Sequence, residues 1–342
     1  MSRPKLAICD LDPVYLRRLD EYIRTHINLS MDIHSFTEPD IFTDFAEKED
    51  INLLIVSEKS YYELEDKHAL GRFKNILILD EERISGAVCE DSGTGKNVEH
   101  VSKYQSASAV SRAVVDMCSR SPEDFKGLWA RAKNSESRLI GFYTPLSRCG
   151  QTSFAVRAGE LLAGNHKTIL LSFESCSSLG GLINEEPEED ITDLMYYAEC
   201  EKDKFCLYLE RIRQTANGLD YIPPAKTALQ LRDISCDRLS ELVELLTNSC
   251  GYECILLDMK EYPDGFMDML RLCDTVFTVT RPQNADKYRL RVFEGVLGKN
   301  GYEDVSARLV KCRLPDIRDK GAYASAIEQL LIGEGLSDGH KA

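Results

Sequence analysis

The sequence predicts an α/β protein in which two parallel, doubly wound sheets follow one another along the chain. Short apolar runs alternate with helix-forming segments from residue 6 to residue 118, and the same alternation restarts at residue 139. Runs this apolar are typical of strands that are covered on both faces, and parallel strands need crossover connections, which the intervening helices would supply. A length of 342 residues also allows two domains, each with a core of its own.

The first domain is placed at residues 1–120. Apolar runs predict its strands at residues 6–9, 33–36, 53–56, 76–79 and 98–101. Helical spacing of apolar residues predicts helices at residues 15–27, 41–45, 64–73 and 107–118. A polar stretch, residues 121–137, follows as a linker helix, with Pro122 at its first position and the chain's single tryptophan, Trp129, expected to pack on one of the domains.

The second domain is placed at residues 138–333, followed by a polar tail at residues 334–342. Its strands are predicted at residues 139–143, 168–173, 219–222, 254–258, 275–279 and 306–310. Its helices are predicted at residues 153–163, 191–198, 204–216, 235–249, 265–273, 285–297 and 323–331.

Charge and composition exclude several classes of function. A net charge of −15 argues against broad binding to nucleic acid or to anionic membranes, since both need a cationic surface. We find neither an apolar run long enough to span a membrane nor an apolar signal region at the start, and we expect a cytoplasmic protein. Most of the 12 cysteines stand singly in apolar segments, as buried thiols in a reducing compartment do.

The segment after the first strand of the second domain resembles a phosphate-binding loop. Compared with G-x-x-x-x-G-K-[ST], residues 145–152 keep Gly150 and Thr152, but Pro145 stands at the first glycine and Gln151 at the lysine. A strand, a tight loop and a helix N-terminus in this order direct backbone N–H groups and a helix dipole at an anion.

Two carboxylates extend this candidate site. Glu174 ends the apolar run 168–173, and Asp258 follows four apolar residues, which is the pattern of a Walker B strand. Ligands of parallel α/β sheets bind outside the carboxyl ends of the strands, where loop, Glu174 and Asp258 all fall. Thr152 and Asp258 are the expected Mg²⁺ ligands, since hydroxyl and carboxylate oxygens suit that ion.

In the first domain Asp10 follows the first of five predicted strands and Lys103 follows the fifth. With this order of elements the domain resembles a response-regulator receiver domain, which has a flavodoxin-like fold. However, Leu11 interrupts the acidic pair, Ser57 stands at the phosphate-accepting aspartate, and Asp80 lies near the Thr/Ser position. Serine cannot form an acyl phosphate, so the resemblance implies a docking or dimerisation module without phosphorylation at residue 57.

The whole chain resembles deviant-Walker ATPases of the MinD/ParA type, and more closely the TadZ/CpaE-type pilus assembly proteins. These proteins join a degenerate receiver-like domain to an atypical ATPase domain and act in assembling Tad (Flp) pilus machinery at the cell pole. The resemblance rests on residues 103–107 (KYQSA), 143–145 (YTP), 148–152 (RCGQT), 172–174 (SFE), 221–224 (YIPP) and 257–258 (LD).

The resemblance assigns roles at matching positions and shows what is missing. Leu146 stands at the signature lysine and Gln151 at the phosphate-loop lysine, so Arg148 is the only cation inside the loop. Glu174 stands at the switch I aspartate that positions the attacking water, and Asp258 at the switch II aspartate. The implied nucleotide-binding residues are Leu146, Ser147, Arg148, Cys149, Gly150, Gln151, Thr152, Ser153, Arg313 and Pro315, the last two beside the adenine.

Three functional hypotheses follow from these features. The first is a dimeric scaffold for Tad/Flp pilus secretion components that binds ATP and Mg²⁺ with weak or absent hydrolysis and is recruited by partners to the cell pole or the inner membrane face. The second is a working ParA/MinD-like ATPase that drives assembly or partitioning, and the third is a pseudo-ATPase that binds no nucleotide. Residues 281–320 carry ten basic and six acidic residues, either as a solvated surface or as a partner or DNA patch.

Overall fold

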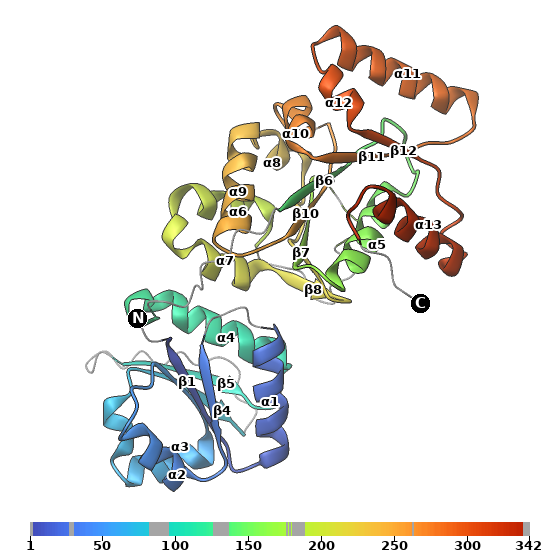
Figure 1. Cartoon of the computed structure of the whole chain (residues 1–342). Helices are drawn as coiled ribbons and strands as arrows, with labels where there is room; N and C mark the ends of the chain where they lie inside the picture. The colour runs from blue at the N-terminus through green and yellow to red at the C-terminus, as the bar shows by residue number, and fades with distance from the viewer. Residues whose placement is uncertain are drawn as a thin grey trace. The chain divides into compact units, whose positions relative to one another are not determined.

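The computed structural model describes residues 3–26, 31–81, 96–125, 137–175, 177, 179, 189–261 and 263–337. By its internal contacts the chain divides into two compact units (Figure 1). The first comprises Met1–Ala130 with Cys206–Arg211, and the second Arg131–Phe205 with Ile212–Ala342. The predicted linker helix contains a 3₁₀ turn, Pro122–Phe125, and its residues 126–136, with Trp129, lie outside the described residues.

The first unit contains a parallel sheet of five strands in the order β2-β1-β3-β4-β5, which is the flavodoxin-like order. Its strands are β1 (Lys5–Cys9), β2 (Asp32–Phe36), β3 (Leu53–Ser57), β4 (Asn75–Asp80) and β5 (Asn97–Ser102). Its helices include α1 (Pro13–His26), α2 (Pro39–Ala46), α3 (Glu58–Asp66) and α4 (Ala107–Arg120). The predicted strands and the parallel sheet are confirmed.

Alternate side chains of these strands enter two separate cores. Leu6 and Ile55 pack with α1 and α4, whereas Ala7 and Leu54 pack with α2 and α3. The sheet is therefore covered on both faces, which explains why its strands are uniformly apolar. The helix predicted at residues 64–73 was misplaced, because the Ser57 hydroxyl caps the helix at Ser60 and starts α3 directly after β3.

The second unit contains a sheet of seven strands in the order β12-β11-β6-β10-β7-β9-β8. The strands are β6 (Arg138–Phe142), β7 (Thr168–Ser172), β8 (Gln214–Ala216), β9 (Leu219–Tyr221), β10 (Cys254–Asp258), β11 (Thr275–Val279) and β12 (Leu309–Cys312). The helices include α5 (Gln151–Ala163), α6 (Ile191–Cys200), α7 (Phe205–Ile212), α8 (Ala228–Arg232), α9 (Cys236–Asn248), α10 (Phe266–Leu272), α11 (Asn284–Lys299), α12 (Glu303–Ala307) and α13 (Lys320–Gly333). All pairs are parallel except β8 with β9.

Two predictions for this unit were wrong in part. The helix predicted at residues 204–216 ends at Ile212, because Asn217 and Gly218 take positive φ angles of 51° and 82° and turn the chain into the β8–β9 hairpin. The strand predicted at residues 306–310 begins only at Leu309, since α12 occupies the preceding residues.

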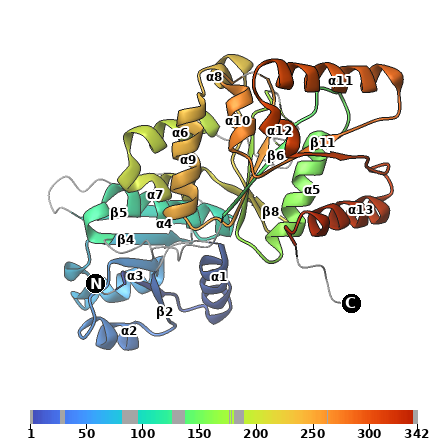
Figure 2. The same cartoon turned by 45° about the horizontal axis from the view of Figure 1, so that its top comes forward.

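The core of the second unit positions α5 against the sheet. Figures 1 and 2 show α5 and α13 on one face of the sheet and α6, α9 and α10 on the other. A Cβ atom at Gly159 would lie 2.8 Å from the Leu219 side chain, so this glycine allows α5 to approach the strands closely. The N-terminus of α5 is thereby fixed at the carboxyl end of β6. In the described part of the chain we find no helix with the length and apolar character that a membrane crossing needs.

Candidate functional site

The loop that joins β6 to α5 has the geometry of an anion-binding turn. Gly150 precedes α5 with a φ of 81° and gives no side-chain cap to the first turn. The first N–H groups of a helix have no partner within the helix, so they are directed at the space in front of α5. Arg148 also has a positive φ, 50°, which is uncommon for a residue with a side chain.

Gln151, which the sequence comparison aligns with the lysine of a phosphate loop, turns its side chain into the protein. Its Oε1 accepts a hydrogen bond of 2.9 Å from the Thr144 N–H. Its Nε2 donates to Asp258 Oδ1 at 2.7 Å and to the Met259 carbonyl oxygen at 3.0 Å. Both amide hydrogens are therefore used, and the residue is buried.

Thr152 brings the two predicted carboxylates together. Its Oγ1 lies 2.8 Å from Asp258 Oδ2 and 2.9 Å from Glu174 Oε2. Asp258 ends β10 and Glu174 follows β7, and these two strands are neighbours in the sheet. Ser172 adds a hydroxyl 3.2 Å from Asp258 Oδ2. The structure thus assembles oxygen atoms from three segments that are far apart in the sequence.

Burial raises the pKa of Asp258, and the nearby Glu174 charge raises it further, while hydrogen bonds from Gln151 and Thr152 oppose the shift. The Thr152 hydroxyl faces one oxygen of each carboxylate but has a single proton, so it can donate a hydrogen bond to only one of them at a time. A cation bound between these oxygen atoms would stabilise all three groups together. An all-oxygen set with two carboxylates fits Mg²⁺, which is usually bound by one or two carboxylates together with ligand phosphates.

Sequence reasoning missed two cations at this site. Lys260 Nζ lies 3.4 Å from Glu174 Oε1, and the Arg281 guanidinium donates a hydrogen bond to the carbonyl oxygen of Arg148. Lys260 comes two residues after Asp258, and Arg281 two residues after β11. A position two residues after the end of an apolar strand was the available signal for both.

The other predicted nucleotide-binding residues lie in different environments. Leu146 is buried, with 3% of its surface exposed, so its side chain takes no part in an open site. Ser147 and Arg148 are exposed on the loop, and burial raises the pKa of the Cys149 thiol. Arg313 and Pro315 are exposed in the segment after β12.

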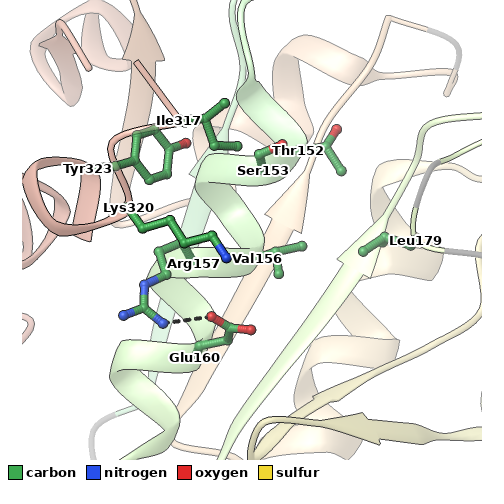
Figure 3. Close-up of a pocket in the computed structure, with 9 residues that line it drawn as sticks. All are labelled: Thr152, Ser153, Val156, Arg157, Glu160, Leu179, Ile317, Lys320 and Tyr323. Atoms are coloured by element: carbon green, nitrogen blue, oxygen red, sulfur yellow. Dashed lines mark hydrogen bonds and ion pairs between the residues drawn. The ribbon is translucent and has the colours of Figure 1, made fainter. Parts of the chain in front are cut away.

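A cavity of about 450 Å³ runs along α5 from its N-terminal end (Figure 3). Its lining residues come from α5, from α13 and from two loop positions: Thr152, Ser153, Val156, Arg157, Glu160, Leu179, Ile317, Lys320 and Tyr323. In Figure 3 Thr152 and Ser153 lie at one end, and Arg157 bonded to Glu160 at 2.8 Å lies at the other. The Tyr323 hydroxyl is buried, with no hydrogen-bond partner among the residues described here. Arg313 and Pro315 are not among the lining residues.

No protein-family model matches the sequence, and no curated protein matches it. Among solved structures, a ParA family ATPase from Chlorobium tepidum is 17% identical, over 59% of this chain and 95% of its own, with a TM-score of 0.42. A putative plasmid partition protein from Borrelia burgdorferi, bound to AMPPNP, is 14% identical over 58% of this chain and 98% of its own, with a TM-score of 0.41. The MinC:MinD complex of Aquifex aeolicus is 16% identical over 58% of this chain and 73% of its own, with a TM-score of 0.40.

Proposed function

We propose that the second unit binds ATP and Mg²⁺ at residues 145–153 and hydrolyses ATP slowly or not at all. The observation that carries this proposal is the Thr152 hydroxyl, held within 2.9 Å of both Asp258 and Glu174 at the start of an uncapped helix. The helix N-terminus suits a phosphate, and the oxygen cluster beside it suits the phosphate's counter-ion.

Each residue of the cluster has a proposed role. The backbone N–H groups of Gln151, Thr152 and Ser153 bind phosphate oxygens, and Thr152 and Asp258 hold Mg²⁺, which when bound offsets phosphate charge. Glu174 positions water, and Lys260 holds the Glu174 carboxylate in place. Arg148 supplies the positive charge that the loop lacks, through a planar fork suited to phosphate.

Slow hydrolysis follows from the missing lysines. Acceleration of phosphoryl transfer depends on charge placed where it develops in the transition state. Gln151 is neutral and is hydrogen-bonded to Thr144, Asp258 and Met259, while Leu146 is buried. Neither residue provides a cation for the transferred phosphoryl group.

The nucleoside has two proposed neighbours beyond the loop. The cavity along α5 begins at Thr152 and Ser153, so a ribose attached to loop-bound phosphates would reach its opening. Arg313 and Pro315 remain our proposed contacts to the adenine, since they follow β12 in the segment that continues to Ile317 of the cavity wall.

In the cell we propose a homodimeric scaffold for Tad/Flp pilus secretion components, recruited by partners to the cell pole or to the inner face of the membrane. The resemblance to TadZ/CpaE-type proteins supports this role, together with the flavodoxin-like strand order of the first unit. Closed two-fold dimers are also the commonest oligomers. The satisfied amide of Gln151 favours one competitor, a pseudo-ATPase that binds no nucleotide.

Calorimetric titration with ATP and Mg²⁺, combined with single-turnover hydrolysis, tests the biochemical part. We expect the wild type to bind ATP with little turnover, and Thr152→Ala to bind it weakly. Arg148→Ala should lose about 1.5–3 kcal/mol of binding free energy, the contribution of a charge-assisted hydrogen bond. The matched control is Arg17→Ala, an exposed arginine of the first unit. Gln151→Lys should raise turnover more than affinity.

Three outcomes would contradict the proposal. If the wild type gives no heat of ATP binding, the hypothesis that survives is a scaffold that binds no nucleotide. If the wild type hydrolyses ATP fast, another cation takes the role of the missing lysine. Light scattering at micromolar concentration, with and without ATP and Mg²⁺, checks the dimer; a monomer in both conditions overturns it.

A further inference from the structure

Helix α11 has two apolar sides, one buried and one exposed. Leu290, Phe293 and Leu297 are buried against the second unit. On the other side Tyr288, Val292 and Val296 follow one another at intervals of four residues, with 65%, 48% and 38% of their surfaces exposed. A surface helix normally presents polar residues to solvent, so this second apolar row is not required by the fold. Figures 1 and 2 show α12 beside α11.

Two glycines stand in the last half of the same helix. A Cβ atom added at Gly295 or at Gly298 would have no described atom within 4 Å. Glycine costs about 0.8–1 kcal/mol relative to alanine inside a helix, and no close packing within the described chain compensates this cost. Gly295 is three residues from Val292 and seven from Tyr288, so it lies on the exposed apolar side, where it leaves room for the backbone of a partner.

Unpaired cations flank the apolar row. Lys287, Arg289, Arg291 and Lys299 are exposed, and no ion pair of theirs is formed with any described residue. Neighbouring basic side chains behave differently, since Lys311 pairs with Glu294 and Arg271 with Asp304. The exposed side of α11 therefore combines an apolar row with positive charge along its borders and, at Lys299, at its C-terminal end, and no described residue forms an ion pair with these cations. The net charge of the chain as a whole is −15.

We propose that this surface, formed by Tyr288, Val292, Gly295 and Val296 with the four flanking cations, binds an acidic amphipathic helix of a partner protein. We call it the α11 outer face. Residues spaced by four form a ridge that fits the groove of a second helix, and carboxylates beside the partner's apolar row would meet the cations.

The cations beside the α11 outer face favour an acidic helix over two other binding partners, a second copy of the chain and a nucleic acid. A second copy of the chain would bring its own four cations to the same contact, and like charges across an interface oppose association. A nucleic acid would place phosphates over the face, where the centre is apolar and gives them no cationic partner.

Fluorescence anisotropy with synthetic helical peptides and the full chain tests the proposal. The probe is a labelled amphipathic peptide with leucines on one side and glutamates along both borders, and its twin carries lysines in place of the glutamates. We expect the acidic peptide to bind the wild type and the lysine twin to bind at least about tenfold more weakly, with an affinity that falls as salt rises.

Variants locate the binding on α11. Val292→Asp and Lys287→Glu should each weaken the acidic peptide several-fold, with an unchanged circular dichroism spectrum. Lys48→Glu, the same change of charge at an exposed position of the first unit, should leave binding unchanged. Binding of a duplex DNA probe tests whether the face binds nucleic acid. Light scattering of Val292→Asp tests whether the face joins two copies of the chain.

The proposal is overturned if the acidic peptide fails to bind, if both peptides bind equally, or if Val292→Asp binds like the wild type. Tighter binding of the DNA duplex, lost in Lys287→Glu, would assign the face to nucleic acid. A dimer that dissociates in Val292→Asp would assign it to a second copy. None of these outcomes depends on whether ATP binds at the loop.

Discussion

The side-chain amide of Gln151 joins the start of α5 to Asp258, at 2.7 Å from its Oδ1 atom. The same side chain accepts a hydrogen bond from the Thr144 N–H after β6 and donates to the Met259 carbonyl after β10. A residue that stands where phosphate loops have a lysine thus connects three segments of the protein. In this structure the connection stabilises the loop itself.

Gln151→Ala should therefore destabilise the second unit even without nucleotide. The change leaves the Thr144 N–H and the Met259 carbonyl without their buried partner, which costs roughly 1–3 kcal/mol for each unsatisfied group. Thermal unfolding by calorimetry measures the effect. Gln283→Ala, at an exposed position whose side chain caps no helix, is the matched control. Equal stability of the two variants would show that the Gln151 contacts contribute nothing.

Asp258 should make the stability of the second unit depend on pH. Its pKa is raised above the ordinary value of 3.8 in the folded state, so its protonated form favours folding. The stabilisation by the protonated Asp258 carboxyl is complete below pH 3.8 and is lost as the pH rises through the raised pKa. Over this pH range Asp258→Asn should therefore become progressively more stable than the wild type, as measured by hydrogen exchange of β6 and β10 amides. A constant difference across pH, or the same trend in the exposed control Asp264→Asn, would contradict this.

The buried ion pair between Lys103 and Asp10 should contribute far more to the stability of the first unit than the exposed pairs do. Lys103 Nζ lies 2.7 Å from Asp10 Oδ2 and 4.8 Å from the centre of the Tyr15 ring, and both charged side chains are buried. Lys103→Met leaves the buried Asp10 charge without its partner and should lower the free energy of unfolding in urea by about 3–5 kcal/mol. Lys59→Met removes the exposed pair with Glu81 and should cost less than about 1 kcal/mol. Adding Asp10→Asn to Lys103→Met should recover much of the loss.

The first unit should not respond to small phosphodonors. Ser57 is buried, its hydroxyl lies 2.9 Å from the Ser60 hydroxyl, and it caps α3. A serine in this position has no carboxylate to form an acyl phosphate, and the nearby Asp10 is neutralised by Lys103. Intact-mass measurement after acetyl phosphate treatment should show no added phosphate. A stoichiometric phosphoprotein that disappears in Ser57→Ala would overturn this expectation.

The sequence by itself determined every strand except β8, although it placed the start of β12 three residues too early. It also determined the parallel sheet of the first unit and the parallel part of the second, and it placed Thr152, Glu174 and Asp258 at or near the ends of buried segments. Apolar runs and helical spacing are local patterns, and the chirality and crossover rules of parallel sheets turn them into a fold. Asn217 and Gly218 also encode the β8–β9 hairpin locally. The prediction missed it because the helix predicted from residue 204 was continued to residue 216, across β8.

Only the tertiary structure decided what the side chains of the site contact. The inward turn of Gln151, the pairing of Lys260 with Glu174 and the hydrogen bond from Arg281 to Arg148 all depend on segments far apart in the sequence. A glutamine in a loop satisfies its amide either with solvent, with a ligand or with the protein, and no local pattern distinguishes these. Here the choice follows from the distance between α5 and β10, which packing around Gly159 and Leu256 fixes.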